Sequence, residues 1–152
     1  MVDLTKKKKI SFILPSLSGG GAEKVFINLA YYFSEKNYEV DLVTLKKRND
    51  YVINFIIYKI NYLCFNKKRT LHSFFELFKY IRNSNSQVFF STISHLNILI
   101  YLINLFLKKK IVYRETNNFN LNLRSLSLIK RIFMKFFIKK ILKENYVVFP
   151  SK

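Results

Sequence analysis

The chain has 152 residues, of which 50% are hydrophobic and 17% aromatic, and this fits one globular domain and excludes a disordered chain. A net charge of +18 indicates an anionic partner: a nucleic acid, a membrane lipid or a phosphorylated substrate. The positive charge is concentrated in residues 66–152, which hold 17 of the 27 Lys and Arg but only three of the nine Asp and Glu. The single cysteine permits no internal disulfide and no cysteine-based metal site.

Short apolar runs alternate with segments of helical periodicity. In chain order we expect a strand over Ile10–Leu14, a helix over Ala22–Lys36, strands over Val40–Leu45 and Phe55–Leu63, a helix over Leu71–Arg82, a strand over Val88–Ser91, a helix over Leu96–Leu107, a strand over Ile111–Arg114, a helix over Leu126–Leu142 and a strand over Tyr146–Phe149. This alternation implies crossover connections, so we predict an α/β fold whose mostly parallel sheet has helices on both faces.

Polar loops follow three of the expected strands, at residues 15–22, 91–95 and 115–122. The carboxyl ends of parallel strands lie at one edge of a sheet, where open α/β sheets bind their ligands. We therefore expect the functional residues of this chain in these three loops.

All three glycines of the chain are adjacent, at Gly19, Gly20 and Gly21, between the first strand and the first helix. Glycine permits positive φ and close approach of a ligand to the backbone, and a helix N-terminus attracts anions. Neither the dinucleotide-binding spacing of glycines nor the P-loop spacing is present. The residues alone leave two interpretations open, a ligand-binding loop and a tight structural turn.

Two further residues in these loops are candidates for ligand binding. His95 follows the fourth strand, where it either contacts a ligand or caps and packs against the next helix. Glu115 is the only acidic residue between Glu76 and Glu144, and it either binds hydroxyl groups or pairs with a nearby cation such as Arg114. No second carboxylate completes a glycosidase-like pair, and no cluster has metal-ligand spacing, so we expect no metal.

The segment 124–143 contains seven Lys and Arg and no acidic residue. Arg131, Lys135, Lys139 and Lys143 are four residues apart and form one stripe on the expected helix. A basic amphipathic helix is typical of attachment to an anionic membrane, so we predict that this stripe faces a membrane. The alternative is a helix that packs on the sheet with a solvated basic face.

Residues 10–45, ISFILPSLSGGGAEKVFINLAYYFSEKNYEVDLVTL, resemble the opening of the family 4 glycosyltransferases of GT-B architecture. Gly20–Lys24 match the family's G-G-A-E-[KR] motif, and Tyr38–Val40 match its G-[HY]-E-V motif, with Asn37 in place of the usual Gly. Three later segments resemble the family more weakly: VFFSTISHLNILIYL, KIVYRETNNFN and ENYVVFPSK. In the second of these, Glu115 and Asn117 match a family S-E-R-N motif, whereas Thr116 replaces its Arg.

The resemblance covers nearly the whole chain and implies the first, acceptor-side domain of a two-domain enzyme, with a Rossmann-like fold over residues 1–152. The second domain, which binds the nucleotide-sugar, is absent from the sequence given. The implied reaction is retaining transfer of a sugar from a nucleotide-sugar to a lipid-linked or saccharide acceptor in cell-surface polysaccharide synthesis, with no cofactor beyond that co-substrate. The implied substrate-binding residues are Gly19, Gly20, Gly21, His95, Glu115 and Asn117. A separate partner chain could carry the missing domain, and we expect no turnover by this chain alone.

Other classes of protein remain open. A small basic protein without catalytic activity could bind a membrane or a partner, and Val88–Leu107 is a stretch of twenty residues without formal charge, about the length of a membrane span. A nucleic-acid-binding protein fits the charge, but no recognised motif supports it, so no nucleic acid is expected. The N-terminus lacks the apolar run of a signal peptide, which favours the cytoplasm, with attachment to the inner face of the plasma membrane.

Overall fold

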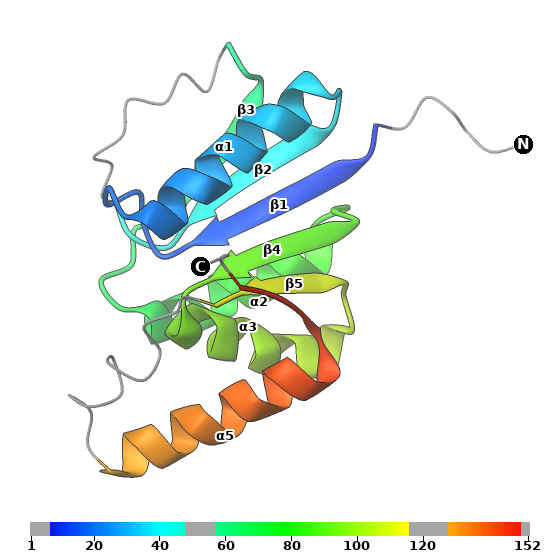
Figure 1. The fold of residues 1–152 in the computed structure, drawn as a ribbon. Coiled ribbons are helices and arrows are strands. Elements are labelled where there is room, and N and C mark those ends of the chain that lie inside the picture. The colour runs from blue at the N-terminus through cyan, green and yellow to red at the C-terminus, as the bar shows by residue number, and fades with distance from the viewer. Residues whose placement is uncertain (1–6, 48–56, 116–127, 150–152) are drawn as a thin grey trace, which may run out of the picture.

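The computed structural model describes residues 7–47, 57–115 and 128–149. In chain order the elements are β1 (Lys9–Leu14), α1 (Gly21–Glu35), β2 (Glu39–Thr44), β3 (Ile60–Cys64), the 3-10 helix η1 (Thr70–Ser73), α2 (Phe74–Asn83), β4 (Val88–Thr92), α3 (Ser94–Leu107), β5 (Ile111–Arg114), α5 (Leu128–Glu144) and β6 (Tyr146–Val148). Six parallel strands form one sheet in the order β3-β2-β1-β4-β5-β6 (Figure 1). The prediction of an α/β fold with a parallel sheet and flanking helices is confirmed.

Two predicted boundaries differ from the structure by three residues or more, and both do so for local reasons. The third strand was expected over Phe55–Leu63, but β3 begins at Ile60 because residues 57–59 form a turn in which Lys59 has φ 49°. The helix expected over Leu71–Arg82 begins with the separate turn η1, and α2 starts only at Phe74. Helical periodicity over Leu71–Arg82 predicts that Leu71 and Phe75 belong to the apolar face of this helix, but both side chains are exposed.

The core has two layers, one on each face of the sheet. On the first face, Phe12 of β1 is fully buried and stacks on Phe90 of β4 at 5.0 Å between ring centroids, with Phe26 of α1 edge-on to it. On the second face, α2, α3 and α5 cover a layer that includes Phe89 and Leu96. Successive strand residues point to opposite faces, so Phe89 and Phe90 belong to different layers.

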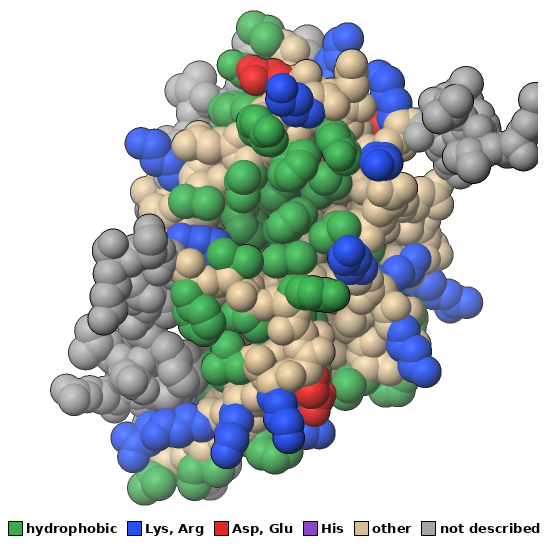
Figure 2. Space-filling view, turned by 45° about the vertical axis from the view of Figure 1, so that its right-hand side comes forward, with side chains coloured by type: hydrophobic (Ala, Val, Ile, Leu, Met, Phe, Trp, Pro, Cys, Tyr) green, Lys and Arg blue, Asp and Glu red, His purple; other side chains and the backbone are tan. Residues whose placement is uncertain are grey.

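The first face is covered less completely than the second. In the part of the chain that the structure describes, α1 alone lies on it, and it packs over β1, β2 and β3. Tyr146 and Val148 of β6, at the far side of the sheet, remain exposed. Figure 2 shows apolar side chains gathered in the middle of the molecular surface, with Lys and Arg around them. Parallel sheets are normally covered on both faces, whereas the described residues leave this part of the first face without a helix over it.

The stretch Val88–Leu107 is not one continuous helix. It forms the strand β4 and the helix α3, which are joined at Ile93. Among the described helices, none combines the length and the apolar character that crossing a membrane requires. The alternative that Val88–Leu107 forms a single membrane-spanning helix is therefore wrong.

Candidate ligand site at the carboxyl edge of the sheet

The strand order reverses between β1 and β4, whose connections leave in opposite directions along the sheet. The carboxyl ends of β1, β4 and β5, at Leu14, Thr92 and Arg114, lie at the same edge of the sheet, together with the start of α1 (Figure 1). We refer to this edge, with residues 15–21, 93–95 and 115, as the carboxyl edge. It is the topological switch point at which open α/β sheets form a ligand crevice.

The three glycines of the carboxyl edge differ in their backbone conformation and in the space available for a side chain. Gly19 has φ 82°, a conformation that other residues adopt only with strain. A Cβ atom added to Gly20 would lie 2.2 Å from Oε2 of the buried Glu23. A Cβ added to Gly21 would meet nothing within 4 Å. Two glycines thus have a structural reason, and Gly21 leaves open space beside the first turn of α1.

Glu115 holds together the neighbouring loop of the carboxyl edge. It is 2% exposed, and its carboxylate accepts hydrogen bonds from Ser94 Oγ and Asn97 Nδ2, both at 2.7 Å. Asn97 also donates to the Arg114 carbonyl at 3.0 Å and accepts from Ser91 Oγ at 2.7 Å. The carboxylate therefore fixes the start of α3 against the end of β5, and it is a positioning residue in this structure.

Two polar groups at the carboxyl edge, on the other face of the sheet, have no hydrogen-bond partner among the described residues. Thr92 and Arg114 are neighbours in the β4–β5 register, so their side chains share a face, which is the face that α1 covers. Thr92 is fully buried, and its Oγ1 and Arg114 Nη1 have no partner. Buried polar groups are normally hydrogen-bonded, so these two groups are donors that remain unused among the described residues.

The backbone between β4 and α3 is strained at the carboxyl edge. Ile93 has φ 74° and ψ 124°, although it is β-branched and such residues rarely adopt positive φ. Conformations of this kind cost about 1–3 kcal/mol and cluster at ligand and active sites. The strain turns the chain sharply, so that Ser94 and His95 follow directly from the end of the strand.

His95 lies in the first turn of α3 with an exposed side chain. The protein around the ring removes part of its hydration, and Lys46 disfavours its positive charge; both effects lower the pKa of His95. The neutral imidazole is thus the favoured form near pH 7, and it can both donate and accept a hydrogen bond.

The lowered pKa of His95 predicts a pH-dependent contribution to stability. Between the unfolded value of 6.5 and the lower folded value, the unfolded chain binds more protons, so the free energy of unfolding falls as the pH decreases through that window. Urea unfolding at pH 7.5 and 5.5 should show a larger loss for the wild type than for His95→Gln. The same substitution at the exposed His72 is the control, and equal losses in wild type and His95→Gln would contradict the prediction.

Part of this site could be predicted from the sequence, and part of it could not. The glycine loop, His95 and Glu115 were expected at the carboxyl edge, and all lie there, whereas Asn117 lies outside the described residues. Thr92 and Ser94 lie in the expected loop 91–95 but were not singled out, and Asn97 lies beyond it, because Ser, Thr and Asn are common and nothing in their spacing marks them. Among the described residues, no three His, Cys, Asp or Glu side chains gather closely enough to hold a metal ion.

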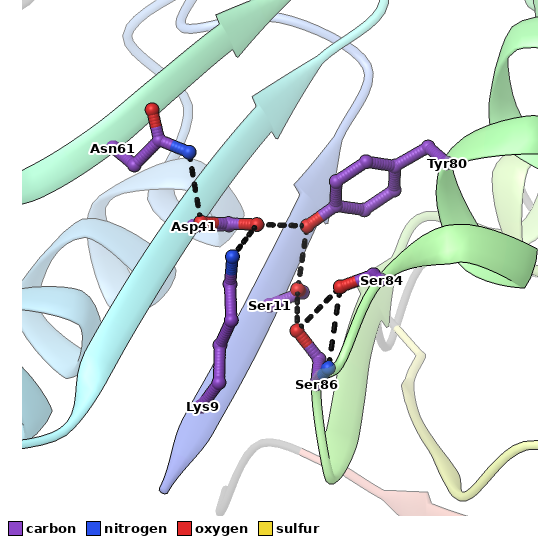
Figure 3. Close-up of polar contacts among 7 residues, drawn as sticks. All are labelled: Lys9, Ser11, Asp41, Asn61, Tyr80, Ser84 and Ser86. Carbon is purple, nitrogen blue, oxygen red and sulfur yellow. Dashed lines mark hydrogen bonds and ion pairs between the residues drawn. The ribbon is translucent and has the colours of Figure 1, made fainter. Parts of the chain in front are cut away.

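A second polar cluster lies on the face that α2 covers (Figure 3). Asp41 is 2% exposed and accepts hydrogen bonds from Tyr80 Oη at 2.6 Å and Asn61 Nδ2 at 3.0 Å, and its carboxylate pairs with Lys9 Nζ at 3.0 Å. Ser11 Oγ lies 2.6 Å from Tyr80 Oη. Burial and the Asp41 charge raise the pKa of Tyr80, which stays protonated as a donor. Because these groups satisfy one another, we assign the cluster a structural role.

Removing the Tyr80 hydroxyl group tests this assignment. Tyr80→Phe should lower the free energy of unfolding by about 2 kcal/mol, because the buried Asp41 carboxylate loses a donor. Tyr146→Phe, at an exposed tyrosine, is the matched control and should change stability by less than about 0.5 kcal/mol in urea unfolding. An equal effect of the two substitutions would show that the cluster contributes nothing specific.

Comparison with known proteins assigns no family to this doubly wound α/β domain. No protein-family model matches the chain, and no curated protein gives a significant match. The resemblance to the family 4 glycosyltransferases therefore depends on the motifs of the sequence itself.

Proposed function

We propose that this chain is the acceptor-side domain of a sugar transferase and that the carboxyl edge binds the acceptor. The observation that carries the proposal is that the glycine loop and the hydrogen bonds of Glu115 lie at the same topological switch point of the sheet. The glycine loop belongs to the G-G-A-E-K motif, and Gly21 leaves room for a ligand at the start of α1. A helix N-terminus of this kind favours phosphate or other anionic groups.

The proposed acceptor is a hydroxyl-rich saccharide, free or lipid-linked. Sugar hydroxyls need donors and acceptors at fixed positions, and this edge offers the neutral imidazole of His95 and the spare donors of Thr92 and Arg114. A second domain, on the same or a partner chain, binds the nucleotide-sugar in this proposal. The exposed apolar residues of β6 are suited to contact that partner.

The division of labour between two domains can be tested by saturation-transfer NMR on the 152-residue chain. We expect saturation transfer to saccharides or sugar phosphates from a panel, and none to the base of a nucleotide-sugar. We also expect no sugar transfer from radiolabelled nucleotide-sugars. Turnover by this chain alone, or binding confined to the nucleotide, would contradict the proposal.

We further propose that α5 attaches the domain to an anionic membrane. Ile138 and Ile141 of α5 are buried, whereas Leu128, Ile132 and Phe136 expose 68%, 63% and 56% of their surface. These three residues are four apart and run beside the basic stripe, of which Lys135, Lys139 and Lys143 are exposed and Arg131 is half-buried. Figure 2 shows Lys and Arg next to apolar side chains along the lower edge, where α5 lies.

Phe133 and Phe136 expose 51% and 56% of their surface, so the apolar side of α5 does not turn wholly toward the sheet, as the alternative of a packed helix with a solvated basic face would require. A helix with apolar and basic residues on its outer side fits the boundary between lipid headgroups and acyl chains. Each lysine near an anionic surface contributes about 1 kcal/mol.

Sedimentation with vesicles tests the membrane proposal. The chain should bind vesicles that contain phosphatidylglycerol and not vesicles of phosphatidylcholine alone. Replacing Lys135, Lys139 and Lys143 by Gln should weaken binding by about 100-fold, the equivalent of about 3 kcal/mol. The control replaces the exposed Lys36, Lys47 and Lys79, with the same loss of charge. Equal weakening by both triple variants would show a general charge effect and contradict a role of α5.

A further inference from the structure

A cavity of about 410 Å³ lies between η1, the start of α3 and the first turns of α5. Its apolar lining comes from Leu71, Ile98, Phe133 and Met134. Protein interiors leave few voids larger than a water molecule, whereas ligand pockets begin at about 300 Å³. The space is therefore large enough for a ligand, and its lining calls for an apolar one.

The surroundings of this cavity are apolar and exposed on one side and basic on the other. Leu71, at the cavity, exposes 74% of its surface, and Phe75, one turn further along, exposes 80%. Lys130 also lines the cavity, and α5 carries no acidic residue before Glu144. A ligand with a long apolar chain and an anionic headgroup matches both the apolar lining and the basic side of this cavity.

We propose that this cavity takes up one acyl chain of an anionic bilayer lipid, with the lipid phosphate beside Lys130. This inference rests on the membrane attachment proposed for α5, and it adds a defined lipid-binding site to that attachment. The exposed Leu71 and Phe133 would lie at the membrane boundary, where the acyl chain of the lipid would enter the cavity. His95 lines the same cavity, so the bound lipid would lie beside the carboxyl edge.

The methionines of the chain allow a direct test. The sequence contains two, Met1 and Met134, and Met134 lines the cavity. A sample with ¹³C-labelled methionine methyl groups thus gives at most two signals, one of which belongs to Met134. The chain is bound to phosphatidylglycerol nanodiscs that carry a spin label either near the end of the acyl chain or on the headgroup.

We expect the acyl-chain label to broaden the Met134 signal more than the headgroup label does. Ile98→Phe, which fills part of the cavity, should restore the Met134 signal while the chain still sediments with vesicles. Lys36→Gln, at an exposed lysine that follows α1 and lies outside the basic stripe, is the control and should leave the broadening in place.

Binding and chain uptake can fail separately in this experiment. If the chain sediments with vesicles but Met134 is broadened only by the headgroup label, the cavity proposal is overturned and membrane attachment stands. If the chain does not sediment with the vesicles, both proposals are overturned. Broadening of Met134 that persists unchanged in Ile98→Phe would also overturn the cavity proposal.

Discussion

Glu115→Ala should lower the free energy of unfolding by about 3 kcal/mol, measured by urea unfolding at pH 7. The substitution leaves Ser94 Oγ and Asn97 Nδ2 without the buried carboxylate that accepts from both. Removing one member of a buried hydrogen-bonded network costs about 1–3 kcal/mol for each neutral group left unpaired, and more for charged ones. The start of α3 should also loosen, which amide hydrogen exchange at His95 would report.

Two further variants separate the network from the mere loss of a carboxylate. Glu115→Gln retains an acceptor oxygen and should cost about 1 kcal/mol. Glu35→Ala, at an exposed position in the last turn of α1, should change stability by less than about 0.5 kcal/mol. If Glu115→Ala were as mild as Glu35→Ala, the carboxylate would have no positioning role.

Gly20→Ala should lower the free energy of unfolding by about 1 kcal/mol. The new methyl group would lie 2.2 Å from Oε2 of Glu23, which is buried and accepts from Ser18 Oγ at 3.3 Å. Oε2 is the far end of a flexible side chain, so relief of the overlap requires only that the Glu23 carboxylate move and give up that contact, which costs about 1 kcal/mol, the net value of one hydrogen bond. Thermal or urea unfolding of the variant measures the loss.

The adjacent glycines serve as matched controls for the same substitution. Gly19→Ala should cost about 1 kcal/mol through its φ of 82°. Gly21→Ala, in the open first turn of α1, should stabilise the chain by about 0.5 kcal/mol, since alanine restricts the unfolded chain. A loss of stability from Gly21→Ala equal to that from Gly20→Ala would contradict the separate roles assigned to the three glycines. If Gly21 faces the ligand, its alanine variant should weaken saccharide binding despite being more stable.

Much of the fold could be predicted because apolar runs and helical periodicity are local properties of the sequence. The strands β1, β2, β4 and β5 lie within one residue of their expected bounds. The late start of β3 could not be read from composition, because Ile57 and Tyr58 are as apolar as a strand although they lie in a turn. The outward direction of Phe133 and Phe136 depends on how α5 packs against α3, which periodicity alone does not determine.

The candidate site could be predicted less completely than the fold. A glycine cluster after a strand and an isolated acidic residue are visible in the sequence, and both lie at the carboxyl edge. The pairing of Glu115 with Asn97 joins residues 18 apart, and the shared face of Thr92 and Arg114 follows only from the strand register. Such contacts depend on the order and register of the strands, so they could not be predicted until the fold was known.

The most direct test of the central claim is to map saccharide binding on the ¹⁵N-labelled chain by NMR, with a panel of saccharides and sugar phosphates. We predict that at least one of them shifts the amide signals of Gly19–Gly21 and of Ser94 and His95, and that Thr92→Val weakens this binding without loss of stability. Thr44→Val is the control, because Thr44 ends β2, which is separated from β4 by β1, and its Oγ1 already has a partner in Tyr62 Oη at 3.0 Å. If every shift mapped away from the carboxyl edge, or no saccharide caused any, the assignment of an acceptor site there would be wrong.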